Sequence, residues 1–200
     1  MDTLELLAHP VRLRVVHALR GGRVLTTGQL CALIPDVSKA TVYRHVDLLA
    51  AGGILDVADE RRVRGAVERR YRLRQERTGI DAETARALTP QHHERAFAAA
   101  MAALVAEFGA YLEREGSDPV DDLVGYRQHA IWLSKDELVA LIGAMQAAIA
   151  PLLANEASRE RTRYLLSPIL FPAEQAEQAE QAEQQDPLQP TPPLAVNQII

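Results

Sequence analysis

Apolar residues recur every three or four positions through the first fifty residues, a spacing that predicts three short helices. The first stripe consists of Leu4, Leu7, Val11, Val15 and Ala18. Proline removes a backbone donor and disfavours helical geometry in the residue before it, so we expect a short lead-in and a fresh helix from about Pro10. Hydroxyl caps predict a second helix from Thr26 or Thr27 to Ile34 and a third from Ser38 to Ala51.

Beyond Gly52 and Gly53 the apolar period shortens from about four residues to two, which predicts a β-hairpin. Its strands leave from Ile54 and return to Leu73, and the tip between them is highly charged. Three helices followed by a hairpin, with a four-residue turn between the second and third helices, is the arrangement of a winged helix-turn-helix.

A long helix with a repeating apolar seam opens the second half of the chain. Thr89 caps it, Pro90 lies in its first turn, and its large apolar residues follow at steps of four and three. We predict that this seam pairs two copies of the chain, and packing within one subunit is the alternative. The seam consists of Phe97, Met101, Leu104, Phe108 and Tyr111.

The remaining apolar segments predict a short β-α-β unit. Residues 124–133 and 164–171 resemble strands, and a helix opens between them with a capping box of Ser134 and Glu137. Trp132, Tyr126 and Tyr164 would line an effector pocket or pack in a core. From Ala173 the chain repeats Ala-Glu-Gln and then becomes proline-rich, a composition typical of a solvated tail.

These patterns predict a mainly α fold with a small β component, in three parts. We expect a winged helix-turn-helix domain over residues 1–77, separated by a polar linker from an α+β region for dimerisation and effector binding over 78–172. A low-complexity, disordered tail would follow over 173–200.

Charge is distributed unevenly along the chain, whose net charge is −5. Residues 1–77 hold 14 of the 22 Lys and Arg residues but 9 of the 27 Asp and Glu residues, so the N-terminal end is the one suited to a polyanion. The single cysteine, Cys31, excludes an internal disulfide and a four-thiolate zinc site. Without a signal sequence or an apolar run of about 18 residues, we expect a cytoplasmic protein and no membrane partner.

The third helix of this arrangement fits the major groove of B-DNA. With Val42 at the centre of its buried side, helical rotation turns Tyr43, Arg44 and Asp47 outward. Arg44 is the best candidate for a base contact, because its fork can span two acceptors of guanine. Hairpin arginines would contact phosphates. The predicted DNA-binding residues are Ser38, Lys39, Ala40, Thr41, Tyr43, Arg44 and His45 in the helix, and Arg61, Arg62 and Arg64 in the hairpin.

The segment Val37–Leu49, followed by Gly53–Leu55, resembles the recognition helix and the start of the wing in ArsR-type regulators. The opening Leu7–Arg12 is similar to the first helix of the same family. The resemblance covers about the first 75 residues and implies a bacterial homodimer that binds a palindromic operator, often as a repressor. The cysteine pair and the aspartate and histidine set of the metal-sensing members are missing, so we do not expect metal sensing.

The sequence leaves a protein-docking function open and disfavours an enzyme. The winged helix could dock a protein partner without DNA, in which case the hairpin arginines would be a solvated charged ribbon. An enzyme is not expected, since we find no phosphate loop and no nucleophile with a nearby base. His92 and His93 point about 100° apart on a helix and lack a third ligand, so we predict neither a metal nor a cofactor.

Overall fold

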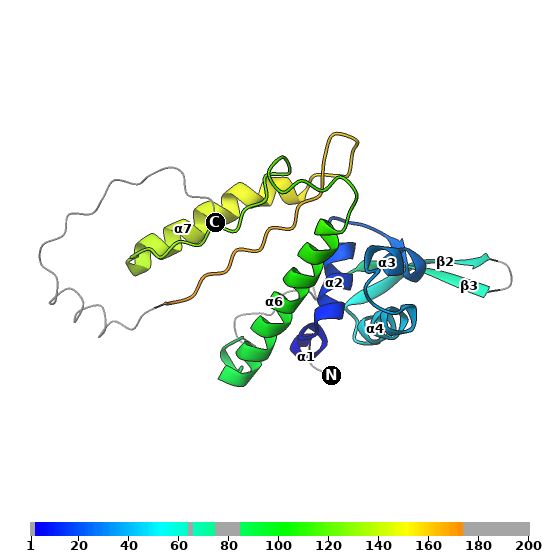
Figure 1. The fold of residues 1–200 in the computed structure, drawn as a ribbon. Helices are drawn as coiled ribbons and strands as arrows, with labels where there is room; N and C mark the ends of the chain where they lie inside the picture. Colours follow the sequence, from blue (N-terminus) through cyan, green and yellow to red (C-terminus); the bar gives the residue numbers. More distant parts are fainter. Residues whose placement is uncertain (1–2, 64–65, 75–84, 174–200) are drawn as a thin grey trace, which may run out of the picture. The chain divides into compact units, whose positions relative to one another are not determined.

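The computed structural model describes residues 3–63, 66–74 and 85–173 of the 200-residue chain (Figure 1). The chain divides into two units, Met1–Asp122 and Leu123–Ile200. The first unit contains the helices and strands of the N-terminal half together with the long helix of the second half. The predicted boundary at residue 77 lies outside the described residues, and the three-part division stays a prediction.

The first unit begins with two helices, α1 (Thr3–Leu7) and α2 (Pro10–Leu19). The break predicted at Pro10 is confirmed: Pro10 is the first residue of α2, and His9 is its N-cap. The His9 Nδ1 atom accepts a hydrogen bond from the Val11 backbone N–H at 3.2 Å. This bond satisfies one of the N–H groups that a helix start leaves without an intrahelical partner.

The next two helices, α3 (Thr27–Leu33) and α4 (Lys39–Ala51), begin where the hydroxyl caps predicted. Thr26 and Gln29 form a capping box on α3. Ser38 caps α4 by accepting a hydrogen bond from the Thr41 backbone N–H at 3.3 Å. The chain leaves α4 through Gly53, whose φ of +72° is a conformation that glycine adopts without steric cost.

A three-stranded antiparallel sheet follows, in the order β1-β3-β2. The predicted hairpin is confirmed as β2 (Leu55–Val63) and β3 (Ala66–Leu73), and it extends away from the helices (Figure 1). The sequence reasoning missed β1 (Leu25–Thr26), because two residues are too short to show a period of two. Arg64, at the predicted tip, lies outside the described residues.

One hydrophobic core holds these elements together. The predicted inward residues Val42, Val46 and Leu49 are fully buried, as are Leu6 of α1 and Ile54 before the hairpin. Tyr71 of β3 brings the sheet into the same core. Because only one side of α4 is buried, its other side is free to contact a binding partner.

The long helix α6 (Pro90–Leu112) packs against α2 in the first unit (Figure 1). Thr89 caps it as predicted. Its buried residues are the small ones, Ala99 and Ala103. His17 of α2 and Glu107 of α6 lie 2.6 Å apart, Nδ1 to Oε1. The helix therefore belongs to the same compact unit as the helix-turn-helix, although the sequence placed it in a separate domain.

The second unit contains the helix α7 (Lys135–Leu153), which opens with the predicted capping box of Ser134 and Glu137. The prediction of a β-α-β unit is wrong. Residues 124–133 and 164–171 form no strand, because in the described chain neither segment pairs with the other or with the sheet. Trp132, Tyr126 and Tyr164 are exposed, so these aromatic residues enclose neither a core nor a pocket. The predicted tail from residue 174 onward lies outside the described residues.

Both long helices, α6 and α7, are long and apolar enough to cross a membrane by length and composition. The expectation that no segment reaches that length is therefore wrong. Length and composition alone are weak grounds for a span, because a packed helix of a water-soluble protein meets the same condition.

Candidate nucleic-acid interface

The outer side of α4 is the centre of the candidate site. Tyr43, Arg44 and Asp47 are exposed, as helical rotation from Val42 predicted. Lys39 and Ala40 are exposed at the start of the helix, and Thr41 is half-buried. This side therefore offers a cation, an aromatic hydroxyl and a small residue to a partner, the residue types that contact bases and phosphates in DNA grooves.

The start of α4 is ordered by its own side chains. The hydroxyls of Ser38 and Thr41 lie 2.8 Å apart, and the Ser38 oxygen also accepts the Thr41 N–H. Both side chains are thus engaged in capping, while Lys39 lies between them in sequence and is exposed. The positive end of the helix dipole, together with Lys39, favours an anionic group at this terminus.

A buried arginine fixes the turn between α3 and α4. Arg14 of α2, 3% exposed, donates two hydrogen bonds to the Asp36 carboxylate, at 2.6 and 2.7 Å. These bonds hold the pKa of Asp36 below its usual value. A two-point contact of this kind restricts rotation as well as distance, so it sets the position of the turn relative to α2. Sequence reasoning missed this pair, since the partners are far apart in the chain.

His45 is the residue for which the predicted site is wrong. It is 2% exposed, and neither ring nitrogen has a hydrogen-bond partner among the described residues. Its ring lies against the His9 ring with 4.3 Å between centroids. Burial, followed by the charge of His9 and two nearby arginines, lowers the pKa of His45 from 6.5 to about 4. His45 is therefore a buried, neutral residue on the core side of α4, not a DNA contact.

The hairpin arginines divide into paired and unpaired groups. Arg69 lies 2.7 Å from Glu60, Arg70 lies 3.1 Å from Asp59, and Arg74 is bound to Asp56. Each of these ion pairs joins opposite strands of the hairpin or its base. Arg61 and Arg62 are exposed, and neither forms an ion pair within the described part of the chain. Arg72, near the base of the hairpin, is also exposed and without an ion pair in that part of the chain, so unpaired charge lies at the base as well as toward the tip, where contact with a phosphate backbone was predicted.

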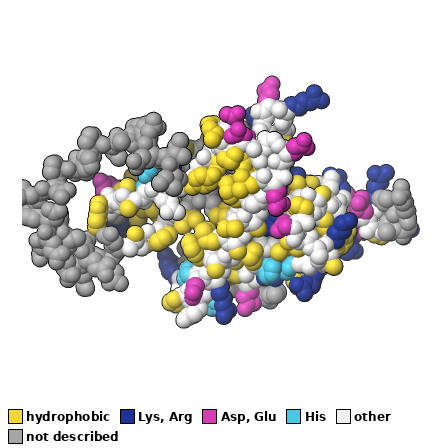
Figure 2. Space-filling model, in the orientation of Figure 1, with side chains coloured by type: hydrophobic (Ala, Val, Ile, Leu, Met, Phe, Trp, Pro, Cys, Tyr) yellow, Lys and Arg dark blue, Asp and Glu magenta, His cyan; other side chains and the backbone are white. Residues whose placement is uncertain are grey.

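Figure 2 shows how the side-chain types are distributed on one face of the molecule. Lys and Arg side chains lie over the hairpin and neighbouring helices, with Asp and Glu among them. Hydrophobic side chains gather along α6. The exposed cationic side chains of α4 and the hairpin that lack an ion pair in the described residues are Lys39, Arg44, Arg61, Arg62 and Arg72. They belong to α4 and the hairpin, the two elements that a winged helix presents to DNA.

The two ends of the predicted dimer seam on α6 differ in their exposure and contacts. Phe97 is about half exposed, and the remaining four residues are half-buried. Tyr111 donates a hydrogen bond to Asp122 at 2.6 Å, and its ring lies near Phe108. The C-terminal end of the seam therefore contacts the following loop, whereas its N-terminal end faces outward. Pairing of two copies through this helix stays a prediction.

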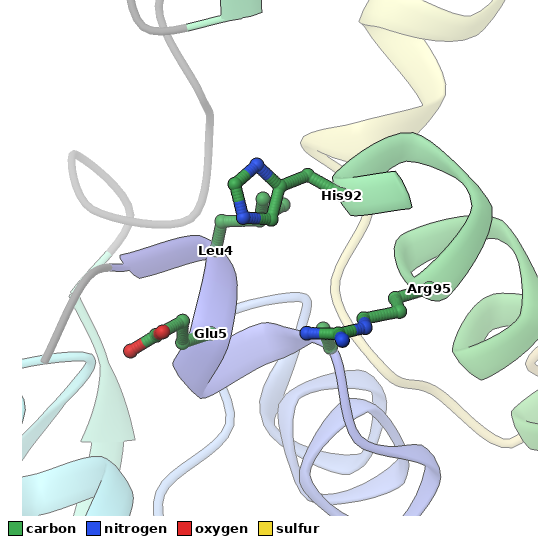
Figure 3. A pocket seen from close by; sticks show the side chains of 5 residues that line it. Leu4, Glu5, His92 and Arg95 are labelled. Carbon is green, nitrogen blue, oxygen red and sulfur yellow. The ribbon is translucent and has the colours of Figure 1, made fainter. Parts of the chain in front are cut away.

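A shallow pocket of about 340 Å³ lies between α1 and α6 (Figure 3). Leu4, Glu5, Ala8, His92 and Arg95 line it. The Arg95 side chain reaches from α6 toward α1, while the Glu5 carboxylate points away from it. Because its polar groups do not converge on one point, we assign no ligand to this pocket.

The remaining candidate residues have structural roles. His92 completes the capping box of α6 with Thr89, so its ring is a helix cap. Cys31 is buried in the core, as expected for a small apolar residue. Among the described residues no group of three or more His, Cys, Asp or Glu side chains could hold a metal ion.

Comparison with known proteins supports the helix-turn-helix. Residues 7–58 match a helix-turn-helix domain family, which is found in ArsR-type regulators. The match runs from the end of α1 into β2, and so covers α2, α3 and α4. Families of this type are typically non-enzymatic regulators that bind DNA. No curated protein matches the chain.

Proposed function

We propose that the chain is a sequence-specific regulator of transcription that binds double-stranded DNA as a homodimer and acts as a repressor. The observation that carries the proposal is the two-sided character of α4. Val42, Val46 and Leu49 fix one side in the core, while Tyr43 and Arg44 are exposed on the other. The helix therefore has a fixed orientation and a free polar surface, and it lies inside the segment that matches a helix-turn-helix family.

The geometry supports a division of labour between two elements. The exposed Arg44 on α4 can reach base edges in the major groove, where a bidentate contact to guanine discriminates by about 1–3 kcal/mol. Arg61 and Arg62 on the hairpin are exposed cations that can contact the phosphate backbone. Such contacts add affinity without sequence information, so specificity is assigned to α4 and general affinity to the hairpin.

The homodimer and the repressor role rest on the resemblance and on the α6 seam. The resemblance to ArsR-type regulators implies a homodimer that binds a palindromic operator. A long helix with apolar residues at steps of four and three is suited to pairing with a copy of itself. In such a dimer the two α4 helices would enter successive major grooves, about 34–36 Å apart. A dimer fixed across a promoter would prevent access of the polymerase.

The proposal is tested by titrating the full chain against fluorescent duplexes and measuring anisotropy. A pool of genomic fragments, enriched by binding to the chain, supplies the operator candidate, and a scrambled duplex of equal composition is the control. We expect tighter binding to the enriched fragment and a steep loss of affinity for both duplexes between about 50 and 200 mM salt. Absence of salt-sensitive binding to any duplex would contradict DNA binding.

A second candidate function is a winged helix that docks a protein without DNA. The observation that favours it is the cross-strand pairing of Arg69 and Arg70 with hairpin carboxylates, which neutralises part of the ribbon. The same titration separates the two functions, since a protein-docking module predicts no duplex binding at low salt.

A further inference from the structure

An ion pair ties the turn between α3 and α4 to α2. Arg14 of α2 donates two hydrogen bonds to the Asp36 carboxylate, at 2.6 and 2.7 Å. The Arg14 side chain is 3% exposed, while the Asp36 side chain is 45% exposed. Two bonds from one planar guanidinium restrict the angle between the partners as well as their distance. The turn therefore has a fixed orientation relative to α2.

This ion pair lies ahead of the first core residue of α4. Asp36 precedes Lys39, the first residue of the helix, by three positions. The first α4 side chain that the core buries is Val42, since residues 39–41 are exposed or half-buried. Val37 also packs against the core, but an apolar contact is non-directional and does not restrict rotation. The ion pair is therefore a directional contact that holds the start of α4 relative to α2.

A base contact from α4 depends on where the start of the helix lies. Hydrogen bonds to base edges need distances of about 2.7–3.2 Å, and recognition requires the donor to be held to about 0.5 Å. Arg44 is two residues after Val42, in the half of α4 nearest to the turn. A change in the turn would move this half, whereas Val46 and Leu49 hold the other half in the core. Phosphate contacts position a protein without reading sequence, so the shift should affect sequence preference first.

The same ion pair is poorly suited to a purely stabilising role. The Arg14 Nε atom is buried and has no hydrogen-bond partner among the described residues. Transfer of a guanidinium out of water has a free-energy cost that can exceed its attraction to one carboxylate. Replacement of both partners of a buried ion pair by uncharged residues of similar size is often neutral for stability. What the two-point contact adds is a fixed direction at the turn before α4.

We infer that Arg14 is a positioning residue for sequence recognition, which acts through Asp36 and the turn on the orientation of Arg44. The inference rests on the proposed function and deepens it, because it adds a residue that controls operator preference without contacting DNA. Arg14 itself is buried, so it is not available to a base or a phosphate.

Two simpler roles for the ion pair make different predictions. If Arg14 only neutralised the Asp36 carboxylate near the DNA, Arg14→Lys would retain that role, since lysine keeps the charge. If the pair only stabilised the fold, its loss would lower the free energy of unfolding without changing sequence preference. A positioning role predicts a loss of preference in a variant that keeps its charge and its stability.

Arg14→Lys in the full chain is the first test. Lysine keeps the charge but makes a point contact, so the angle between α2 and the turn is no longer fixed. We expect the preference for the enriched genomic fragment over the scrambled duplex to fall about tenfold, which is within the range that a bidentate base contact supplies. Affinity for the scrambled duplex should be nearly unchanged. Arg74→Lys is the matched control, because Arg74 also binds an aspartate, Asp56, through two bonds, and it should keep the wild-type preference.

A second variant keeps the inference testable if Arg14→Lys does not fold. Arg14→Met/Asp36→Asn removes one positive and one negative charge, so the net charge is unchanged and no buried charge is left without a partner. Urea unfolding should show a stability close to that of the wild type, while the preference falls as in Arg14→Lys. Full preference in the folded variants, or an equal loss of affinity on both duplexes, would overturn the inference.

Hydrogen exchange without DNA separates failure of this inference from failure of the proposed function. In Arg14→Lys we expect faster amide exchange over residues 36–43 and unchanged exchange at Val46 and Leu49, which stay in the core. If the wild-type chain binds no duplex but this local change occurs, the DNA-binding proposal fails and the link between Arg14 and α4 holds. If the wild type prefers the enriched fragment and Arg14→Lys keeps that preference, the positioning role is wrong and the regulator stands.

Discussion

The buried His45, on the core side of the helix proposed to read DNA, lies against the half-buried His9. Both His45 ring nitrogens are without partners among the described residues, and the neighbouring charged groups are Arg12 and Arg44, both cationic. Burial is the first cause of the lowered pKa of both histidines. Protonation of either ring would add a positive charge beside these arginines, so burial and repulsion both favour the neutral rings.

The stability of the first unit should therefore fall as the pH falls. The folded pKa of His45, about 4, is below the ordinary value of 6.5, so the unfolded state binds more protons between these values. We expect full stability above pH 6.5 and a loss of about 1–2 kcal/mol on acidification toward pH 4, smaller than the full shift implies because the site relaxes.

Urea unfolding of the full chain at several pH values, followed by circular dichroism, measures this dependence. His45→Leu should flatten it, and the exposed His93→Leu is the matched control that should not. An unchanged pH dependence in His45→Leu would show that another group is responsible.

His45 and Arg14 show which buried residues the helical period can predict and which it cannot. His45 is three residues after Val42, on the same side of α4, so burial could have been expected from rotation alone. Packing against the fold and contact with a phosphate were both open for His45 on the sequence, and the predicted site included it among the DNA-binding residues. Arg14 could not have been assigned in this way, since its burial depends on Asp36, which only the folded chain brings within hydrogen-bond distance.

At the scale of elements, the hairpin shows how strand register decides which charges are available. Residues equally far from the turn face each other, which places Glu60 opposite Arg69 and Asp59 opposite Arg70. With one strand ending at Val63 and the next beginning at Ala66, this rule predicts both pairs. The irregularity between Val57 and Asp59 shifts the register by one residue only beyond Asp59, so that Asp56 faces Arg72.

Removing unpaired hairpin cations should change the salt dependence of DNA binding. In Arg61→Ala/Arg62→Ala we expect weaker binding to all duplexes and a salt slope that is smaller by about one for each phosphate that is no longer neutralised. Glu60→Ala/Arg69→Ala removes an ion pair without changing net charge and should leave the slope unchanged. Anisotropy titrations over a salt series make the comparison. Equal slopes in all three proteins would exclude the hairpin from the interface.

Substitution of Arg44 on α4 should reduce the preference for the operator sequence while leaving the affinity for other duplexes nearly unchanged. Arg44→Ala leaves the core side of the helix intact, so folding should be unaffected. We expect a loss of about 1–3 kcal/mol in preference for the selected operator, with little change on a scrambled duplex. Competition between the two duplexes measures the preference. An equal loss on both would reassign Arg44 to phosphate contact.

Local signals explain why helices were predicted better than strands. Caps at Thr26, Ser38, Thr89 and Ser134 are decided within three residues of sequence, and all four helix starts were confirmed. A strand depends on a partner elsewhere in the chain. Residues 124–133 have the apolar composition of a strand, but no described segment pairs with them.

At the scale of the whole molecule, α6 belongs with the helix-turn-helix. Ala99 and Ala103 are buried, and the His17–Glu107 contact joins α6 to α2. Small residues allow the two helices to approach closely. The alanines and the larger seam residues occupy different sides of α6, so contact with α2 leaves part of the seam outside the core.

Overpacking this contact should destabilise the entire first unit. Ala103→Leu adds volume at a position without exposed surface, and we expect the free energy of unfolding to fall by about 1–3 kcal/mol. Ala102→Leu, exposed on the neighbouring position, should have little effect. Urea unfolding of both variants gives the difference. An equal loss of unfolding free energy in the two variants, or no loss in either, would contradict the assignment of Ala103 to the contact between α6 and α2.

The position of α2 links the two ends of this unit mechanically. Arg14 and His17 are three residues apart, so they lie on adjacent turns of one rigid rod. Arg14 holds the turn that leads into α4, and His17 contacts α6. A change in the tilt of α6 would therefore move α2, and α2 would in turn change the angle at which α4 meets the DNA.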